Sequence, residues 1–368
     1  MKYTDEFRDP VAAHRLLEEI STLISTPISV MEFCGGHTHA IMRYGLRQAL
    51  AHKVRLLSGP GCPVCVTDDS DIDHIIALAQ QPGVVVATFG DMVRVPGTRS
   101  SLQEARAAGA QVSIVYSALD ALEQARNAPN LQVVMLGIGF ETTAPTVAAS
   151  LLQAHEQGVG NYYVYSLHKL TPPAMRAILD AGEVRLDAIL GPGHVTAIIG
   201  GRSWEFLARE YGISCAMAGF EPVDILQAIY ALARATHDHA PQIINAYRRG
   251  VTDEGNRVAQ TLLTQVFEVT TATWRGLGEI PASGLALRAE FAAHDAKRVF
   301  DLPDADASAD LSAHRRGCRC GDVLRGVLDP PECPLFGRAC TPARPVGPCM
   351  VSGEGSCAAH YRYGGVLT

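Results

Sequence analysis

Short apolar runs alternate with amphipathic segments over the first two thirds of the chain. Continuous apolar runs of this length are typical of strands that are buried on both faces. Helical periodicity separates most of them, for example at 101–108, 118–128 and 173–181. Eight such strands are expected, at 28–33, 54–57, 84–89, 112–116, 131–136, 162–165, 186–190 and 213–217. This alternation predicts an α/β fold with parallel sheets, either one closed eight-stranded barrel or two smaller open sheets.

Short motifs that recur along the chain favour two open sheets. LLSGPGC (56–62) resembles ILGPGH (189–194), HAIMR (39–43) resembles PPAMR (172–176), and FGDMV (89–93) resembles GFEPV (219–223). The three matches keep the same order and nearly the same offset, which indicates a duplicated α/β unit.

After residue 219 the pattern changes, with helices expected at 222–236, 241–249 and 258–269 and no strand between them. An Asp- and Ala-rich stretch at 301–309 is expected to be an exposed loop. We therefore predict two similar open parallel-sheet (Rossmann-like) domains plus a mainly helical domain. The expected boundaries are an N-terminal helix packing on the rest (1–25), a first α/β domain (26–128), a second α/β domain (129–220) and a helical domain with a Cys-rich tail (221–368).

Charge and composition restrict the function. The 368 residues include 31 Lys and Arg against 38 Asp and Glu, a net charge of −7, so neither nucleic acid nor an anionic membrane surface is an expected partner. The N-terminus lacks the apolar core of a signal peptide, and no apolar run reaches the ~18 residues of a membrane span. A cytoplasmic protein is expected. Cytoplasmic cysteines stay reduced, so its ten cysteines indicate metal or redox chemistry.

Chemically distinctive residues follow the predicted strands, where open α/β sheets bind their ligands. Cys34, His37 and His39 form a Cys-x-x-His-x-His cluster after the first strand, and thiolate with imidazole suits iron, zinc or copper. An inert thiol in a turn explains it about as well. A position at a helix N-terminus would lower the pKa of Cys34. Cys62 and Cys65 follow the second strand with a spacing typical of a redox pair or half a zinc site. No second Cys-x-x-Cys pair exists, which favours redox use.

Other strand ends carry weaker candidates. Glu141 lies with Thr142 and Thr143 at the start of a predicted helix, where it would bind an anion or a metal-bound ligand, although capping explains the threonines. His194 follows the seventh strand in a Gly-Pro-Gly turn and is equally compatible with a hydrogen-bonded loop histidine. Asp91 and His168 are weaker still, and Cys215 lies in an apolar strand and is expected to be a core residue.

The tail carries six of the ten cysteines, at 318, 320, 333, 340, 349 and 357. Their spacing fits neither the short ferredoxin pattern nor a zinc finger. Four thiolates would hold a [4Fe–4S] cluster and leave two over, but spacing does not decide which four, and a zinc-binding tail remains an alternative. Arginines outnumber acidic residues around them and would offset the charge of such a cluster. The chain has no Gly-Lys dipeptide and hence no phosphate-binding P-loop, and it lacks a Cys-x3-Cys-x2-Cys run.

Taken together, the motifs resemble one family. CGGHTH (34–39), GPGCPVC (59–65), GFETTAP (139–145), GPGHVTAIIG (191–200), CRCGDVLRG (318–326) and CMVSGEGSCAAHY (349–361) are similar to those of the hydrogenase maturation protein HypD. The resemblance implies [NiFe]-hydrogenase maturation, in which a scaffold and the chaperone HypC assemble an Fe(CN)2CO group, with cyanide supplied by HypE and, upstream, HypF. Asp68 departs from the family pattern, in which proline commonly follows this motif.

The resemblance also implies roles for the site residues. Cys34 would be the ligand of the iron cargo with His37 beside it, Cys62 and Cys65 would be a thiol pair, and Glu141 and His194 would line the cleft. A [4Fe–4S] cluster is implied at Cys318, Cys333, Cys340 and Cys357. This leaves Cys320 and Cys349 as a second redox pair, an arrangement similar to ferredoxin–thioredoxin reductase.

Electrons would pass from the cluster through Cys320 and Cys349 to Cys62 and Cys65 for cyanide transfer. Such a chain is a redox-active assembly scaffold, and no turnover reaction follows from the sequence. The rival hypothesis is a free-standing [4Fe–4S] thiol–disulfide reductase, which accounts for the thiol pairs but not for the Cys34 cluster.

Overall fold

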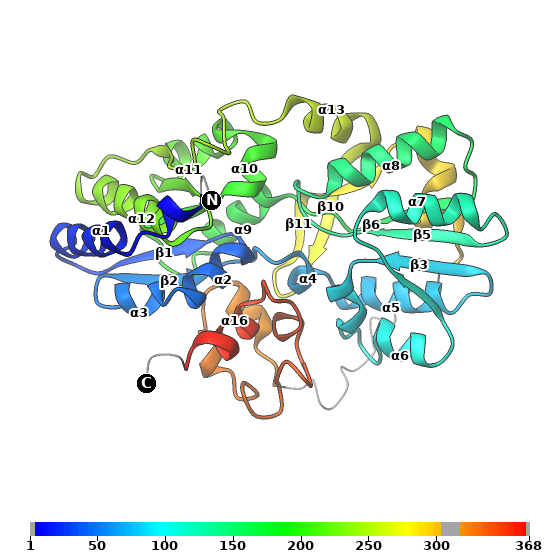
Figure 1. Ribbon diagram of the computed structural model, residues 1–368, viewed down its shortest axis with the longest axis horizontal. Helices are drawn as coiled ribbons and strands as arrows, with labels where there is room; N and C mark the ends of the chain where they lie inside the picture. The colour runs from blue at the N-terminus through cyan, green and yellow to red at the C-terminus, as the bar shows by residue number, and fades with distance from the viewer. Residues whose placement is uncertain (1–3, 303–316, 366–368) are drawn as a thin grey trace.

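The computed structural model describes residues 4–302 and 317–365, so most of the predicted 301–309 loop lies outside the described residues. All eight strands expected in the first two thirds of the chain are present, and they form two open parallel sheets (Figure 1). The closed barrel is excluded. Among the described residues, no helix combines the length and the apolar character needed to cross a bilayer.

Sheet 1 has the strand order β2-β1-β7-β8-β9, and every pair in it is parallel. Its strands are β1 (Ile28–Glu32), β2 (Val54–Ser58), β7 (Ala188–Pro192), β8 (Ser214–Ala218) and β9 (Ile243–Asn245). The helices of its lobe are α1 (Pro10–Leu23), α2 (Gly35–Arg43), α3 (Leu46–Leu50), α9 (Thr171–Ala181), α10 (Gly193–Ile199), α11 (Glu205–Glu210) and α12 (Pro222–His237), with short η1 (Asp5–Phe7) and η3 (Gly201–Trp204). Helix α1, capped by Asp9 with Pro10 in its first turn, packs on α12, as expected for the N-terminal helix.

Sheet 2 has the strand order β4-β3-β5-β6 and is also parallel throughout. Its strands are β3 (Val84–Thr88), β4 (Gln111–Ile114), β5 (Gln132–Gly137) and β6 (Tyr162–Ser166). The helices of this lobe are α4 (Pro63–Val66), α5 (Asp69–Ala79), η2 (Gly90–Arg94), α6 (Leu102–Ala107), α7 (Ala118–Asn127) and α8 (Ala144–Glu156). Helix α7 begins at a capping box in which Ser117 and Asp120 satisfy each other's backbone donors.

The two sheets exchange strands, so strand pairing crosses the boundary expected at residues 128/129. Read from its other edge, sheet 2 has the order β6-β5-β3-β4, which matches β2-β1-β7-β8 of sheet 1 position by position. In this match β1 and β2 correspond to β5 and β6, and β3 and β4 correspond to β7 and β8. The duplicated unit is therefore β1–β4 and β5–β8, and each copy gives two strands to each sheet. The offset inferred from the recurring Gly-Pro-Gly motif is wrong, since it would equate β2 with β7. Those matches are only a few letters long and arise by chance.

The region after residue 219 is less helical than expected. Segment 241–249 contains β9 and loops instead of a helix, and an antiparallel hairpin of β10 (Phe267–Trp274) and β11 (Gly278–Leu287) follows α13 (Arg257–Val266). The hairpin lies between the two lobes (Figure 1). Its residues β-bridge to both sides, at Thr67↔Trp274 and Lys169↔Gly284. Its strands have mixed, largely exposed faces and so lack the continuous apolar runs that revealed the other strands.

The tail folds beneath α2, on one side of the two lobes (Figure 1). The remaining elements are short: η4 (Ala289–His294), α14 (Ala296–Val299), α15 (Cys320–Leu324), η6 (Pro330–Glu332), η7 (Pro348–Met350) and α16 (Ser356–Tyr363). The largest core cluster runs through both sheets and into the tail, and it includes Cys65, Leu136, Met217 and Cys349. The cysteine-rich tail is therefore packed as part of the same body.

Candidate functional site

Two strand-end turns of sheet 1 lie in direct contact at the cleft. Cys34 follows β1, and the turn of Gly59 to Cys62 follows β2, which is the neighbouring strand. The Gly35 backbone N–H donates to the Gly61 carbonyl at 3.0 Å. A Cβ on Gly61 would lie 2.4 Å from the Cys34 nitrogen, so only glycine allows this approach. The fold thereby brings the Cys34 and Cys62 loops together, as expected for the carboxyl ends of parallel strands.

Cys34 is the N-cap residue of α2, yet its thiol is not acidified. Burial, together with the carboxylates of Glu354 and Glu32, raises the pKa of Cys34 to about 12, although backbone N–H groups of Gly36 and His37 favour the thiolate. The expectation that a helix N-terminus would lower this pKa is therefore wrong, since desolvation outweighs the helix dipole. Glu32 accepts the Cys34 backbone N–H at 2.9 Å and also binds the Thr38 hydroxyl. Burial raises the pKa of Glu32 to about 8.

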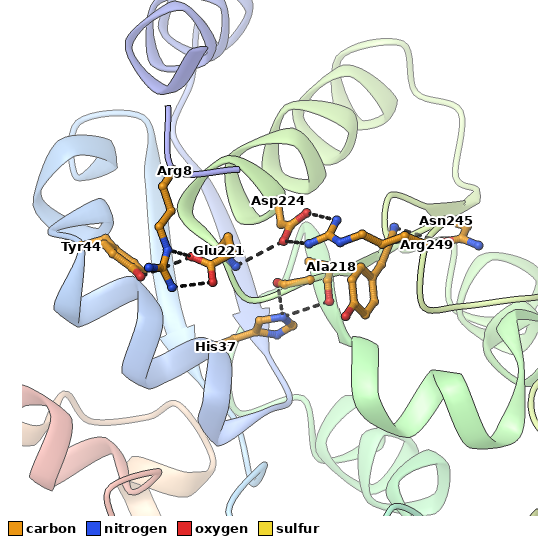
Figure 2. A network of polar contacts seen from close by, with 10 residues as sticks. Arg8, His37, Tyr44, Ala218, Glu221, Asp224, Asn245 and Arg249 are labelled. Carbon is orange, nitrogen blue, oxygen red and sulfur yellow. Dashed lines mark hydrogen bonds and ion pairs between the residues drawn. The ribbon is translucent and has the colours of Figure 1, made fainter. Parts of the chain in front are cut away.

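His37 is held in one tautomer directly behind Cys34. Its Nε2 lies 3.2 Å from the Ala218 carbonyl and 3.0 Å from the Gly219 carbonyl, so Nε2 carries the proton (Figure 2). Its Nδ1 is buried and has no hydrogen-bond partner among the described residues. Burial lowers the pKa of His37 to about 4, which keeps the ring neutral. A neutral imidazole with one unused acceptor nitrogen is suited to accept a proton or to ligate a metal.

The turn after β8 holds both histidines, and Phe220 in this turn lies between them. The Phe220 ring stacks on His37 at 4.6 Å and on His194 at 3.9 Å between centroids. His194 begins α10 and remains exposed, and its pKa is lowered by partial burial. The sequence predicted His194 at the cleft but missed Phe220, since an isolated Phe after a strand carries no distinct signal.

Ion pairs fix this turn from the other side (Figure 2). Arg249 donates to both carboxylate oxygens of the buried Asp224, at 2.6 Å to Oδ1. Asp224 accepts the Glu221 backbone N–H, and Glu221 in turn pairs with Arg8 and accepts from the Tyr44 hydroxyl. Bidentate guanidinium contacts are strongly directional, so they hold the start of α12 and hence the carbonyls that bind His37.

A tail loop closes the opposite side of the Cys34 turn. Ser352 donates to Asp91 of sheet 2 at 2.8 Å, the Gly353 carbonyl lies 3.2 Å from His39 Nδ1, and Glu354 packs on Gly35. A Cβ on Gly35 would lie 2.6 Å from the Glu354 carbonyl oxygen. Asp91 and His39 therefore anchor the tail, and Glu354 is a site residue that the sequence did not single out. Its contact with residue 35, more than 300 positions away, has no local signal.

Cys62 and Cys65 form a disulfide at the start of α4. Cys62 is the N-cap residue, and both cysteines are buried. The Cys65 sulfur lies 3.9 Å from the Pro348 carbonyl oxygen, so the disulfide packs against the η7 turn that contains Cys349. The thiol pair therefore connects the Cys34 loop with the tail.

All six tail cysteines line one cavity, with Phe336, Gly347 and Met350 among its other walls. The cavity-lining cysteines are Cys318, Cys320, Cys333, Cys340, Cys349 and Cys357. The sulfurs of Cys320 and Cys349 lie 2.8 Å apart. Burial raises the pKa values of Cys318 and Cys340. Neighbouring thiols raise them further: Cys333 acts on both, and Cys357 acts on Cys340. Cys349 also contacts Cys357, and Cys320 also acts on Cys318, so thiol contacts run through the whole group of six.

This cavity fits an iron–sulfur cluster on several physical grounds. Five of its six cysteines are buried and Cys318 is partly exposed, and Cys340 accepts the Val346 backbone N–H at 3.3 Å, a contact that stabilises a thiolate. A Cβ on Gly347 would lie 2.6 Å from the Cys318 sulfur, so glycine leaves room at this wall. As the side chains stand, no group of three or more His, Cys, Asp or Glu within 4–302 and 317–365 has metal-ligand geometry.

The remaining candidates have other surroundings. Glu141 is buried and accepts the backbone N–H and the hydroxyl of Thr171, both at 2.8 Å, so it fixes the start of α9. Burial raises the pKa of Glu141 to about 7. Thr143 precedes α8, but its hydroxyl donates to the Ile138 carbonyl and makes no cap bond. Cys215 is fully buried in β8, as expected of a core residue.

His168 is buried behind the end of β6. Its Nδ1 lies 3.2 Å from the Ser166 hydroxyl, and burial lowers its pKa to about 3. These contacts give His168 a packing role.

Comparison with known proteins identifies the family of the chain. Residues 11–364 match the family model HypD, described as the hydrogenase formation hypA family. The chain is 45% identical to the hydrogenase maturation factor HypD of Rhodobacter capsulatus, with 99% of each chain covered. It is 45% identical to HypD of Cupriavidus necator and 42% identical to HypD of Escherichia coli, covering 97% and 98% of those proteins. The chain belongs to the HypD family of hydrogenase maturation factors.

Proposed function

We propose that this chain is a redox-active scaffold on which the Fe(CN)2CO group of [NiFe] hydrogenase is assembled. The observation that carries the proposal is the contact of the Cys62–Cys65 disulfide with the η7 turn on one side and the Cys34 turn on the other. A candidate iron ligand, a redox pair and a cysteine-lined cavity are thus contiguous. Hydrogenase maturation is common to the family, whereas the following roles are our proposal.

Cys34 is the ligand of the iron cargo, and a small chaperone of the HypC type supplies the second protein ligand. CO and cyanide are strong-field ligands that favour low-spin Fe(II), and a soft thiolate suits that ion. The Cys34 thiol must lose its proton when it binds iron, since the thiolate is the ligand form. His37, three residues further along, stays neutral, and its Nδ1 has no hydrogen-bond partner among the described residues. The stacked Phe220 keeps His37 oriented and excludes water from that side.

Cys318, Cys333, Cys340 and Cys357 hold a resident [4Fe–4S] cluster. The division leaves Cys320 and Cys349 as the second pair, and their sulfurs are close enough to form a disulfide, at 2.8 Å. When bound, the cluster supplies single electrons. The buried thiols keep it from water, and the arginines of the tail offset its charge.

The two cysteine pairs communicate by thiol–disulfide exchange. A Cys349 thiolate attacks the Cys65 sulfur, Cys62 leaves as a thiolate, and Cys320 then resolves the mixed disulfide. The products are a Cys320–Cys349 disulfide and a reduced Cys62/Cys65 dithiol, so two electrons and two protons have moved. That dithiol can reduce a thiocyanate carried by HypE: the pair is oxidised to a disulfide, the S–CN bond breaks, and the carrier thiol and hydrogen cyanide are released.

Infrared spectroscopy of the protein purified with its chaperone tests the scaffold role. We expect CN and CO stretching bands that disappear in Cys34→Ala, while visible absorption of the cluster persists because its ligands lie in the tail. Cys215→Ala is the matched control, since Cys215 is a buried thiol of the same sheet, and it should keep the bands. Retention of the bands in Cys34→Ala would remove Cys34 as the essential ligand. Absence of the bands in the wild-type complex would instead favour a free-standing thiol–disulfide reductase.

A further inference from the structure

A second hollow lies on the outer side of the cysteine-rich tail, away from the cleft. It is a groove of about 640 Å³ between α2, α3, η6 and α16. Its apolar wall comes from Met42, Pro331, Phe336 and Tyr361. Tyr361 is 45% exposed, which is a high exposed fraction for a large aromatic side chain. No described residue covers this exposed part of the ring.

Phe336 separates this groove from the cysteine cavity. The same side chain lines both hollows, and its ring meets that of Tyr361 at 6.2 Å between centroids. Phe336 lies between Cys333 and Cys340 in the chain, and Tyr361 follows Cys357 by one turn of α16. Phe336 is therefore a wall shared by the groove and the proposed cluster site, and the ring of Tyr361 lies beside it on the groove side.

The rim of the groove is positively charged. Arg338 follows the lining residue Gly337, and Arg362 follows Tyr361; both are exposed, and neither makes an ion pair within the described ranges. Of the acidic residues at the groove, Asp329 pairs with Arg47 at 2.7 Å, whereas Glu332 accepts the Asp329 backbone N–H and keeps its charge, so one carboxylate stands against the two arginines. The free charge offered to a partner is thus cationic, although the whole chain carries −7.

We propose that this groove is the docking site of a small acidic one-electron carrier protein that reduces the tail cluster. This inference rests on the cluster of the proposed function. One electron leaves the reduced carrier and enters the cluster, and no bond or proton changes. The exposed Tyr361 supplies the aromatic anchor typical of a protein interface, and the arginines steer an acidic partner. Electron transfer weakens steeply with distance, so docking over Phe336 is the effective position.

Stopped-flow reduction under anaerobic conditions tests the inference with two probes. The first is a reduced plant-type [2Fe–2S] ferredoxin, which is small and acidic, and the second is methyl viologen radical, which needs no docking site. Binding of the oxidised ferredoxin is measured separately by thermophoresis, which does not require the cluster. The variants are Arg338→Glu/Arg362→Glu and Tyr361→Ala. Their matched controls are Arg15→Glu/Arg106→Glu, which makes the same charge change on α1 and α6, and Tyr116→Ala, which removes a tyrosine that is 93% exposed on the other lobe.

For the rim double variant we expect both ferredoxin binding and the second-order rate of cluster reduction to fall about tenfold or more at low salt. Reduction by viologen should stay unchanged, and wild-type reduction by ferredoxin should slow as salt is raised. Tyr361→Ala should weaken binding at all salt concentrations. Equal binding by the rim variant and its control would overturn the docking site, and so would wild-type binding that is insensitive to salt. A wild-type protein without cluster absorption would refute the proposed function, while the binding comparison would still decide on the docking surface.

Discussion

The contact between α2 and the tail loop predicts that a substitution at Gly35 lowers the stability of the protein. Gly35→Ala places a Cβ 2.5 Å from the Glu354 Cβ and 2.6 Å from its carbonyl oxygen. Both distances are shorter than real Cβ contacts, and one partner is backbone, which cannot rotate away. The tail loop must shift, and overpacking of this kind costs about 1–3 kcal/mol. Because the loop also joins His39 and Asp91, the shift should loosen the contact between the tail and both lobes.

Gly353→Ala is the matched control from the same loop. A Cβ there meets nothing within 4 Å, and Gly353 is not among the residues with positive φ. Replacing such a glycine restricts the unfolded chain and should stabilise the protein by about 0.4–1 kcal/mol. The two substitutions should therefore change stability with opposite signs.

Thermal unfolding of the anaerobically purified proteins measures the difference. We expect Gly35→Ala to melt several degrees below the wild type and Gly353→Ala at or above it, since about 1 kcal/mol moves the midpoint by roughly 2–4 °C in a large domain. Limited proteolysis should cut the Gly35→Ala tail first. A Gly35→Ala protein as stable as the Gly353→Ala protein would show that the tail does not pack on α2 as described.

Three further predictions concern the cysteines and Glu141. Single Ser substitutions at the four proposed cluster cysteines should lose iron and sulfide, whereas those at Cys320 and Cys349 should retain them; the reverse pattern in elemental analysis would refute the assignment. Mild oxidation should lower the thiol count of the reduced wild type, and Cys62→Ser should make that loss smaller by two thiols; an equal loss in both proteins would exclude a redox role for Cys62 and Cys65. Burial raises the pKa of Glu141 to about 7, above its unfolded value, so stability from its bound proton is lost as pH rises through 7. Between pH 5 and 8, denaturant unfolding should therefore show Glu141→Gln gaining up to about 3 kcal/mol relative to the wild type, and parallel pH profiles would contradict this.

The sequence was sufficient to predict where the eight strands lie in the chain, but not which strands pair with one another. All eight predicted strands are present because continuous apolar runs report burial on both faces, which is a local property. Sheet membership depends on which strands pair, and an apolar run such as Val84–Thr88 would suit either sheet. The exchange of strands between lobes therefore remained hidden. The β10–β11 hairpin was missed for the opposite reason, since its exposed faces give no apolar run.

Site residues were predictable where their side chains are chemically rare. Cysteines at strand ends stand out in any sequence, and Cys34, Cys62 and the tail thiols lie at or beside the site as expected. Residues that act through contacts were missed. Phe220 matters because two histidines stack on it, and Glu354 because Gly35 lies beneath it; both contacts join residues far apart in sequence.

The correct duplication also explains why Glu141 resembled a site residue. Strands β1 and β5 are equivalent, so VMEFCGGHTHA (30–40) corresponds to VMLGIGFETTA (134–144), and Glu141 takes the place of His37. Both turns end a central parallel strand, where ligands usually bind. In the first copy the turn carries Cys34. In the second copy the equivalent position is Ile138, and the Glu141 carboxylate accepts the two hydrogen bonds from Thr171. At this turn one copy thus carries thiol and imidazole side chains, whereas the other carries a carboxylate that makes a structural contact. Because each copy gives two strands to each sheet, neither copy can be removed without dismantling both sheets.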